Sequence, residues 1–437
     1  MNASYPLTSR RPDDVIACLD GAEVRVDEFL GQVRALAADL PDHRYVINLA
    51  GSRYTFLLGF CAATVAGQCT LLPPNRQKAT VQGIRDEFTD NYVFDGTALP
   101  RSAPATDVPE IPADRLVAMV FTSGSTGEST AHRKYWHTLQ AGAFANKDCY
   151  GIGDERIYML ATVPPQHNWG LETSVLLPLV ADVAISGETP LFPQDIADAL
   201  TRLPEPRALV SSPMHLDSLL QSGISGIRID RILSATAPMS TQLARQLESR
   251  FGARVNEVFG CTEAGSLASR ATASESLWHI AAPFDFDVRD NKVRVSAEHL
   301  PEPVDLNDIV ELVGDSAFRW LGRDQDMINI AGKRGSLAHL NHRLTRIPGV
   351  LDGVIFLPEE DSKRLAALVV APGLEPSAIL DALKEAIDPA FLPRPLYLVP
   401  MLPRQETGKL ARKMVLDLFE TRRRLSEDDG EPADNSR

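Results

Sequence analysis

The chain has 437 residues, of which 44% are hydrophobic and 23% are charged, as in ordinary soluble globular proteins. This length suits two or three domains, and the composition excludes a collagen-like, low-complexity or disordered chain. Asp and Glu outnumber Lys and Arg by 58 to 44, giving a formal net charge of −14, so no general attraction to nucleic acid is expected.

The cysteine pattern and the apolar runs predict a cytoplasmic protein without membrane insertion. The five cysteines are odd in number and never form a CxxC pair, which argues against both a disulfide framework and a zinc site. Residues 1–14 contain no apolar signal-peptide core. The longest largely apolar stretch, residues 56–67, is well short of the roughly 18 residues needed to cross a bilayer.

Two helices are predicted near the N-terminus. Asp27 is expected to cap a helix whose apolar positions recur at helical spacing over residues 30–40. Residues 54–66 are apolar on all sides and end at Gly67, which predicts a buried helix with a glycine stop.

From about residue 112 onward, short apolar runs alternate with loops and amphipathic stretches. We predict strands at residues 116–121, 157–161, 208–211, 232–234 and 255–259. A helix between the last two is predicted to start after Ser240 and to stop at Gly252. This alternation predicts an α/β fold with parallel strands, in which ligands bind at the carboxyl ends of the strands.

The pattern changes after about residue 285. Hairpins are predicted around residues 289–292 and 314–317, and a smaller α+β unit with an amphipathic helix near residues 380–387 follows. The sequence therefore predicts a large α/β N-terminal domain, a small α+β C-terminal domain and a disordered acidic tail, at residues 1–322, 323–424 and 425–437.

The most specific chemical signal is the loop that follows the first of the predicted strands. It consists of Thr122, Ser123, Gly124, Ser125, Thr126 and Gly127. Its glycines allow a tight turn, while its hydroxyls and exposed amides can donate to phosphate oxygens. No Gly-Lys-Ser/Thr follows at the Walker A spacing, which disfavours a P-loop kinase. The loop predicts a phosphate site, with a solvated turn as the alternative.

Three further motifs follow this loop in order. They read Val-Phe-Gly-Cys-Thr-Glu, Leu-Gly-Arg-Asp and Pro-Arg-Gln-Glu-Thr-Gly-Lys, at residues 258–263, 321–324 and 403–409. The ordered set resembles the signature motifs of the acyl-adenylate-forming (AMP-forming) ligase superfamily, which includes acyl- and aryl-CoA synthetases, nonribosomal-peptide adenylation domains and firefly luciferase. The resemblance covers about residues 117–413. It implies a large adenylation domain, a small mobile C-terminal lid domain, and ATP and Mg²⁺ as cofactors.

The resemblance also implies roles for individual residues. Contacts to the ATP phosphates, the adenine and the ribose are implied for Thr122 to Gly127, for Ala235, Thr236, Ala237, Pro238 and Phe259, and for Asp308 and Arg323, respectively. Thr262 would approach the α-phosphate, and Glu263 would bind Mg²⁺, which prefers carboxylate oxygens. Lys409 would be the catalytic lysine that stabilises charge as the carboxylate attacks. Each charged residue here has an alternative as an ordinary surface or ion-pair residue.

Residues 164–169, Pro-Pro-Gln-His-Asn-Trp, stand where the superfamily places its carboxylate pocket. The resemblance implies substrate contacts for His167, Asn168, Trp169 and Gly260, and a catalytic position for His167. The His-Asn-aromatic order is similar to that of the members that activate aryl acids. The Asn168 amide could then hydrogen-bond a ring hydroxyl, and Trp169 could form the wall of a flat pocket. The alternative is that His167 and Trp169 pack beneath the loop.

The glycine-rich loop departs from the superfamily pattern. Gly127 is followed by residues 128–130, Glu-Ser-Thr, where the superfamily usually has Pro-Lys, so the loop lysine is absent. Lys134 or Arg133, a few residues downstream, is a candidate replacement. The segment before the loop is also shorter than is usual in the superfamily.

The expected hinge between the domains is at Asp324 and Gln325, where the superfamily usually has Asp or Lys at the second position.

The favoured function is a two-step ligase that activates a carboxylic acid, such as a hydroxybenzoate, and transfers it to a phosphopantetheine thiol. Coenzyme A and an acyl carrier protein both remain open as acceptor, and a fatty acid remains open as substrate. A nucleotide- or acyl-adenylate-binding module without turnover is the alternative from another functional class.

Overall fold

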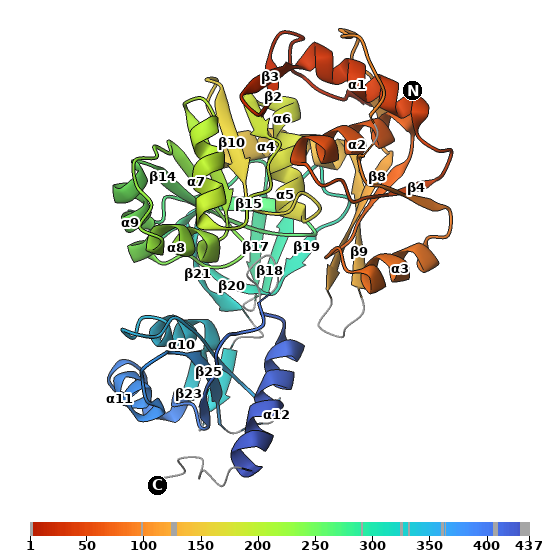
Figure 1. The fold of residues 1–437 in the computed structure, drawn as a ribbon. Helices are drawn as coiled ribbons and strands as arrows, with labels where there is room; N and C mark the ends of the chain where they lie inside the picture. The colour runs from red at the N-terminus through yellow and green to blue at the C-terminus, as the bar shows by residue number, and fades with distance from the viewer. Residues whose placement is uncertain are drawn as a thin grey trace. The chain divides into compact units, whose positions relative to one another are not determined.

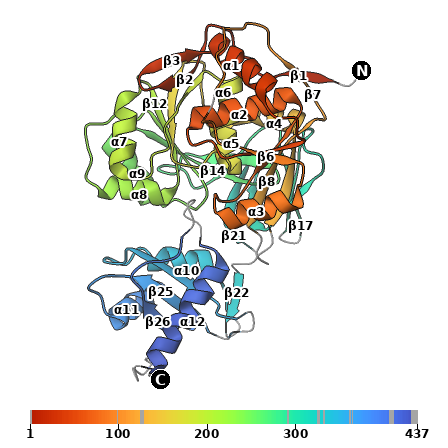
Figure 2. The ribbon, with the colours of Figure 1, turned by 45° about the vertical axis from the view of Figure 1, so that its right-hand side comes forward.

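The computed structural model describes residues 3–97, 99–123, 129–289, 292–323, 327–330, 333–359, 362, 364–404 and 410–428. The chain forms two compact units (Figures 1 and 2). The first unit runs to residue 287 and includes residues 294–304 and 312–318. The second unit takes residues 288–293, 305–311 and the described residues from 319 onward. The hairpins after residue 285 thus contribute strands to both units.

The largest sheet has a parallel centre. Its strands are β2 (Val15–Leu19), β3 (Ala22–Arg25), β10 (Ile157–Ala161), β11 (Val183–Ser186), β12 (Arg207–Ser211), β13 (Arg231–Ser234), β14 (Arg254–Cys261), β15 (Gly265–Arg270), β16 (Trp278–Ile280), β20 (Asp308–Val313) and β21 (Ala317–Arg323). They are ordered β20-β21-β16-β15-β14-β13-β12-β10-β11-β2-β3. The strands from β2 through β11, β10, β12 and β13 to β14 pair in parallel, which confirms the predicted α/β alternation.

A second sheet of the first unit contains the two strands that flank the glycine-rich loop in the sequence. Its strands are β4 (Tyr45–Asn48), β5 (Cys69–Leu72), β6 (Asn91–Phe94), β8 (Leu116–Ser123) and β9 (Ser129–Tyr135). They are ordered β6-β4-β5-β8-β9, and β8 and β9 pair antiparallel so that Thr122 faces Thr130 and Val120 faces His132. The loop therefore joins two paired strands. Smaller sheets contain β1 (Ser4–Pro6), β7 (Glu110–Pro112), β17 (Asp285–Arg289), β18 (Lys292–Ser296) and β19 (Val304–Leu306).

Helices cover these sheets in the first unit (Figure 1). They are α1 (Val26–Asp39), α2 (Arg53–Ala66), α3 (Lys78–Glu87), α4 (Trp136–Cys149), α5 (Asn168–Leu171), the π-helical turn η1 (Glu172–Leu176), α6 (Leu177–Val180), α7 (Pro193–Arg202), α8 (Pro213–Gln221) and α9 (Thr241–Phe251). The glycine stops of α2 and α9 are confirmed, since Gly67 and Gly252 take left-handed φ values of 83° and 69°. The Ser240 cap is confirmed by a 3.1 Å bond to its side chain from the Leu243 amide.

The predicted cap of α1 is wrong. This helix begins at Val26, directly after β3, so Asp27 lies inside its first turn and Arg25 occupies the cap position. The Asp27 carboxylate accepts a hydrogen bond from the Glu28 amide at 2.9 Å. An acidic side chain in the first turn also stabilises the helix through its dipole, so Asp27 favours the helix start without capping it.

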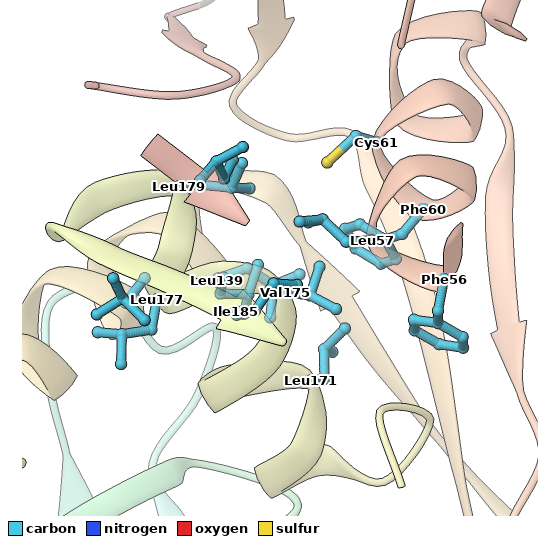
Figure 3. Packing of buried hydrophobic residues seen from close by; sticks show 14 of the residues in the cluster. Phe56, Leu57, Phe60, Cys61, Leu139, Leu171, Val175, Leu177, Leu179 and Ile185 are labelled. Carbon is cyan, nitrogen blue, oxygen red and sulfur yellow. The ribbon is translucent and has the colours of Figure 1, made fainter. Parts of the chain in front are cut away.

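The main hydrophobic core lies where α2 meets β11, η1 and α6 (Figure 3). Leu57 and Phe60 come from α2, Val175 from η1 and Ile185 from β11, and each of these side chains is at most 1% exposed. Burying an aliphatic or aromatic side chain of this size stabilises a fold by about 1.5–3 kcal/mol. Because η1 directly follows α5, this core also fixes the segment that contains His167 to Glu172.

The second unit is an α+β structure. Its elements are β22 (Met327–Ile330), β23 (Lys333–Ser336), α10 (Leu337–Leu344), β24 (Asp352–Phe356), β25 (Ala366–Val370), α11 (Pro376–Ala386), the 3-10 turn η3 (Pro389–Phe391), β26 (Leu396–Leu398) and α12 (Arg412–Asp428). Strand β25 pairs antiparallel with β24 and parallel with β26. The predicted amphipathic helix is α11, whose Ile379 and Leu383 are fully buried.

Helix α12 extends to Asp428, so residues 425–428 of the predicted tail are helical. Among the described residues, no helix is long and apolar enough to cross a bilayer.

Candidate functional site

Thr122 places the start of the glycine-rich loop next to a histidine. Its hydroxyl lies 3.0 Å from Nε2 of His132, which is on the paired strand β9. Only the backbone of Ser123 is described, and Gly124 to Gly127 lie outside the described residues. The phosphate contacts predicted for those four residues therefore stay predictions.

Thr262 and Glu263 form the turn between β14 and β15, and two glycines make this turn possible. A Cβ atom added to Gly260 would lie 2.2 Å from the carbonyl oxygen of Gly265, and Gly265 itself has a left-handed φ of 89°. A larger residue at Gly260 would therefore separate the two strands. The Glu263 side chain is 48% exposed, so its carboxylate is accessible to a ligand from solvent.

Two side chains of β9 converge on this turn. Lys134 is 4% exposed, and its Nζ donates to the carbonyl oxygen of Thr262 and, at 3.5 Å, to that of Glu263. His132 Nδ1 lies 3.8 Å from Oε1 of Glu263. Arg133, between them in sequence, is exposed, as expected for the opposite face of a strand. Of the two candidate replacements for the loop lysine, the structure therefore brings Lys134 to the site and leaves Arg133 outside it.

Burial is the largest cause of the pKa shifts of Lys134 and His132. It lowers the pKa of Lys134, an effect opposed by the nearby carboxyl groups of Glu172 and Glu263. It also lowers the pKa of His132, which the charge of Glu263 opposes and that of Lys134 reinforces.

The predicted adenine segment follows β13 directly. Thr236 has a φ of 77°, an unusual value for a residue with a branched side chain and one often found at functional sites. Directly after the segment, the amide of Met239 donates to Oε1 of Glu257 at 2.8 Å. Glu257 is 2% exposed, and its other oxygen accepts bonds of 2.7 and 3.0 Å from Arg270. A buried ion pair therefore anchors the end of this segment to the sheet.

Phe259, predicted to stack on the adenine, belongs to an aromatic cluster. Its ring centroid lies 5.6 Å from that of Trp278 and 5.3 Å from that of Phe318. These edge-type contacts fix the orientation of the Phe259 ring, which is only partly buried.

The predicted acid segment is organised by a buried carboxylate that the sequence interpretation missed. His167 precedes α5 as its cap residue, and Trp169 is 8% exposed and packs in the main core. Asn168 donates from Nδ2 to Oε1 of Glu172 at 3.1 Å. Glu172 is the first residue of η1 and is 7% exposed. Trp169 thus packs in the core, while the Asn168 side chain is fixed by its hydrogen bond to the Glu172 carboxyl group.

Glu172 connects the acid segment to the Thr262–Glu263 turn. Its Oε2 accepts bonds from the Ser266 hydroxyl at 2.6 Å and the Tyr150 hydroxyl at 3.2 Å. A Cβ added to Gly265 would lie 2.6 Å from its Oε1. Burial raises the pKa of Glu172, and these hydrogen bonds and the charge of Lys134 oppose that rise.

Arg53, at the start of α2, holds the chain just before the acid segment. Its guanidinium is fully buried and donates to the carbonyls of Val163 and Ala161 and to the Ser174 hydroxyl, at 3.0, 2.7 and 2.8 Å. Burial lowers its pKa to about 9. Arg53 thereby connects the end of β10 to η1 across the acid segment.

The remaining predicted residues belong to the second unit or lie outside the described residues. Asp308 begins β20 and accepts a 2.8 Å hydrogen bond from the Trp320 indole. Arg323 ends β21, and only its backbone is described. Asp324, Gln325 and Lys409 lie outside the described residues. The structure therefore brings together the predicted nucleotide and acid residues of the first unit only.

Some of the missed residues carried a usable signal. Glu172 stands four residues after Asn168, a spacing that places both on one face of a helix. His132 alternates along a strand with Lys134, which was already a candidate, so the two side chains share a face. Arg53 and Glu257 gave no such signal, because their partners are distant in sequence.

The donor set fits ATP with a hard cation. Within the described residues, no group of three or more His, Cys, Asp or Glu side chains is arranged to hold a metal ion. Mg²⁺ commonly uses one or two carboxylates together with water and substrate phosphates. The exposed Glu263, near Thr122 and the start of the glycine-rich loop, suits that arrangement.

The chain is similar to known proteins of one enzyme family. The AMP-binding enzyme family matches residues 35–298, which is more than half of the chain. A 4-coumarate–CoA ligase from Halorhodospira halophila is 26% identical over 302 residues, covering 66% of this chain and 73% of that protein. A 3,4-dihydroxybenzoate–[aryl-carrier protein] ligase from Bacillus anthracis is 20% identical over 321 residues, covering 69% and 74%.

Solved structures show the same fold. ATP-bound MatB from Rhodopseudomonas palustris superposes with a TM-score of 0.79 at 16% identity, covering 94% of this chain and 96% of that one. O-succinylbenzoate CoA synthetase (MenE) from Bacillus subtilis, in complex with ATP and magnesium ion, gives 0.80 at 15% identity, covering 94% and 99%. The predicted architecture of a large N-terminal and a smaller C-terminal domain is confirmed. The chain therefore belongs to the AMP-binding enzyme family.

Proposed function

We propose that the protein activates an aryl acid, such as a hydroxybenzoate, with ATP and transfers it to a phosphopantetheine thiol of an acyl carrier protein or of coenzyme A. In the first step a carboxylate oxygen attacks the α-phosphorus, and the bond to pyrophosphate breaks. In the second step the thiol, losing its proton, attacks the acyl carbon, and AMP leaves. The mixed anhydride supplies the good leaving group that the free carboxylate lacks.

The observation that supports this proposal most directly is the convergence of two predicted motifs. The His132 ring lies 3.0 Å from the Thr122 hydroxyl and 3.8 Å from the Glu263 carboxylate, although these residues are 141 positions apart (263 − 122). In the proposed site, Thr122 and Thr262 contact phosphate oxygens and Glu263 binds Mg²⁺. When bound, Mg²⁺ would neutralise phosphate charge. Lys409 is the proposed group that stabilises charge at the α-phosphate.

The orientation of one amide supports the proposed acid class. Oε1 of Glu172 accepts a hydrogen bond from Nδ2 of Asn168, and this contact orients the Asn168 amide with its nitrogen toward Glu172. The Asn168 oxygen then remains as an acceptor, which suits an acid with a hydroxyl or amino substituent rather than a plain fatty acid. Relatives named for hydroxylated aryl acids, 4-coumarate and 3,4-dihydroxybenzoate, agree with this choice.

We also propose a reducing, cytoplasmic location. The cysteines are all free thiols, four of them buried and Cys261 partly buried. Free thiols without a disulfide framework fit a reducing compartment.

The test is acid-dependent ATP–pyrophosphate exchange, run with Mg²⁺ over benzoate, hydroxybenzoates, aminobenzoates, cinnamates and fatty acids of graded length. We expect exchange with substituted aryl acids, and its loss in Lys409→Ala while ATP binding is largely retained. Lys413→Ala is the matched control in the same region of the chain and should leave exchange intact. Unchanged exchange in Lys409→Ala would remove Lys409 from the mechanism.

A second candidate function is a nucleotide-binding module without turnover. It is favoured by the sequence after Gly127, which has no lysine at the expected position, and by Gln325 at the expected hinge. This candidate predicts ATP binding without exchange for any acid. Exchange with one acid class excludes it.

A further inference from the structure

Strand β9 presents two basic side chains to the proposed nucleotide site, and this arrangement answers the question of the absent loop lysine. His132 and Lys134 lie on one face of the strand, and both contact the Thr262–Glu263 turn. Arg133 is exposed on the other face. The contacts of His132 and Lys134 differ in kind, so each residue has a separate effect on the turn.

Lys134 acts on the main chain. Burying a lysine is costly unless its charge is compensated, and here carbonyl oxygens and nearby acidic groups supply that compensation. Its Nζ bonds to the carbonyls of Thr262 and Glu263, so it fixes the position of the turn and leaves both side chains available to a ligand. A lysine held in this way is not a flexible surface cation that reaches for phosphate.

His132 acts on side chains. Its two ring nitrogens face the Thr122 hydroxyl and the Glu263 carboxylate, at 3.0 and 3.8 Å. A rigid ring between these groups sets the separation between the start of the glycine-rich loop and the carboxylate proposed for Mg²⁺. The His132 side chain is 15% exposed, so part of the ring is open to solvent.

We propose that His132 and Lys134 form a positioning pair that replaces the missing loop lysine: Lys134 fixes the backbone of the Thr262–Glu263 turn, and His132 spaces Thr122 from Glu263. Together they pre-form the site for the Mg²⁺-bound triphosphate of ATP. This inference rests on the proposed function and adds to it the residues that build the triphosphate site.

The experiment measures equilibrium binding of ATP, with and without Mg²⁺, for the wild type and for Lys134→Met, Lys134→Arg, His132→Ala and Arg133→Met. Loss of a hydrogen bond to a charged group changes an equilibrium by about tenfold or more. We expect Lys134→Met to weaken Mg-ATP binding by about that factor and His132→Ala by a smaller one. Lys134→Arg should recover part of the loss, and the matched control Arg133→Met should bind like the wild type.

Exchange kinetics separate positioning from a merely structural role. The KM for ATP and the Mg²⁺ concentration for half-maximal exchange should rise in Lys134→Met and His132→Ala, while the KM for the acid stays near the wild-type value. Thermal unfolding checks that the variants are folded. If Lys134→Met does not fold, Lys134→Arg and His132→Ala decide, and wild-type Mg-ATP binding by both would overturn the proposal.

Two other outcomes would also overturn it. Equal loss in Arg133→Met would indicate a general charge effect of the strand, and unchanged Mg-ATP binding in a destabilised Lys134→Met would indicate a purely structural lysine. Failure of the proposed function is recognised separately, because the wild type would then bind Mg-ATP without any acid-dependent exchange.

Discussion

Glu263 and Glu172 both lie close enough to Lys134 to influence its charge, but they differ in exposure and in hydrogen bonding. The Glu263 side chain is 48% exposed, at the tip of a turn, and its carboxylate lies 3.8 Å from Nδ1 of His132. Glu172 is 7% exposed and accepts hydrogen bonds from Ser266, Tyr150 and Asn168. The comparison shows that a carboxylate already saturated by protein donors stabilises the fold, while an exposed one is available for a ligand. Replacing Glu172 should therefore mainly reduce stability, and replacing Glu263 should mainly reduce activity.

The largest expected effect on stability is that of Glu172→Ala. This change leaves Lys134 buried with less compensating charge, and it removes the carboxylate acceptor of the Tyr150 and Ser266 hydroxyls, which keep their 2.8 Å contact with each other. Removing one member of such a buried network costs about 3–5 kcal/mol of the free energy of unfolding. Urea unfolding measures it, with the exposed Glu155→Ala as control at about 0.5 kcal/mol or less. Equal stability of the two variants would break the comparison.

An intermediate effect is expected for Glu257→Gln, which tests whether a buried carboxylate can also serve the nucleotide. The change weakens the pair with Arg270 and the bond to the Met239 amide, at an expected cost of about 1–3 kcal/mol. The end of the adenine segment would then be less well fixed, so the KM for ATP should rise while the KM for the acid does not. Glu275→Gln, at an exposed carboxylate, is the control. An unchanged KM for ATP would leave Glu257 with a structural role only.

The smallest effect on stability is expected for Glu263→Gln, within about 0.5 kcal/mol of the wild type, because the side chain is exposed. Exchange activity should nevertheless fall by about a hundredfold or more, since a bound metal ion contributes several kcal/mol to transition-state stabilisation. Titration with Mg²⁺ should show a lost or greatly weakened dependence. Wild-type exchange in this variant would remove Glu263 as the proposed ligand.

Much of the fold could be predicted because its signals are local. The Gly67 and Gly252 stops, the Ser240 cap and the strand over Ile157–Ala161 each depend on neighbouring residues, and the structure confirms them. The error at Asp27 arose because an acidic residue favours both the cap and the first turn of a helix. The sequence alone did not show that β3 ends at Arg25. The helix therefore starts directly after the strand, and Arg25 rather than Asp27 occupies the cap position.

The candidate site could be predicted only in part, for a related reason. Thr122 and Glu263 stood out because motifs surround them. Glu172 did not, because its meaning depends on Tyr150 and on Ser266, 94 positions away. Arg53 likewise bonds a carbonyl 110 positions away. Such residues are ordinary charged residues in a sequence and become informative only when burial forces them to find partners.

The buried thiols have a practical consequence for labelling chemistry. Burial raises the pKa of Cys69, Cys149 and Cys261 to about 12, and it raises those of Cys18 and Cys61 as well. At neutral pH a thiol with a pKa of about 12 is ionised in only about one molecule in 100,000, and the thiolate is the reactive form. A cysteine introduced at the exposed Ser225 would therefore react with a maleimide dye far faster than the native ones. One fluorophore can therefore be attached selectively at an introduced cysteine in the native protein.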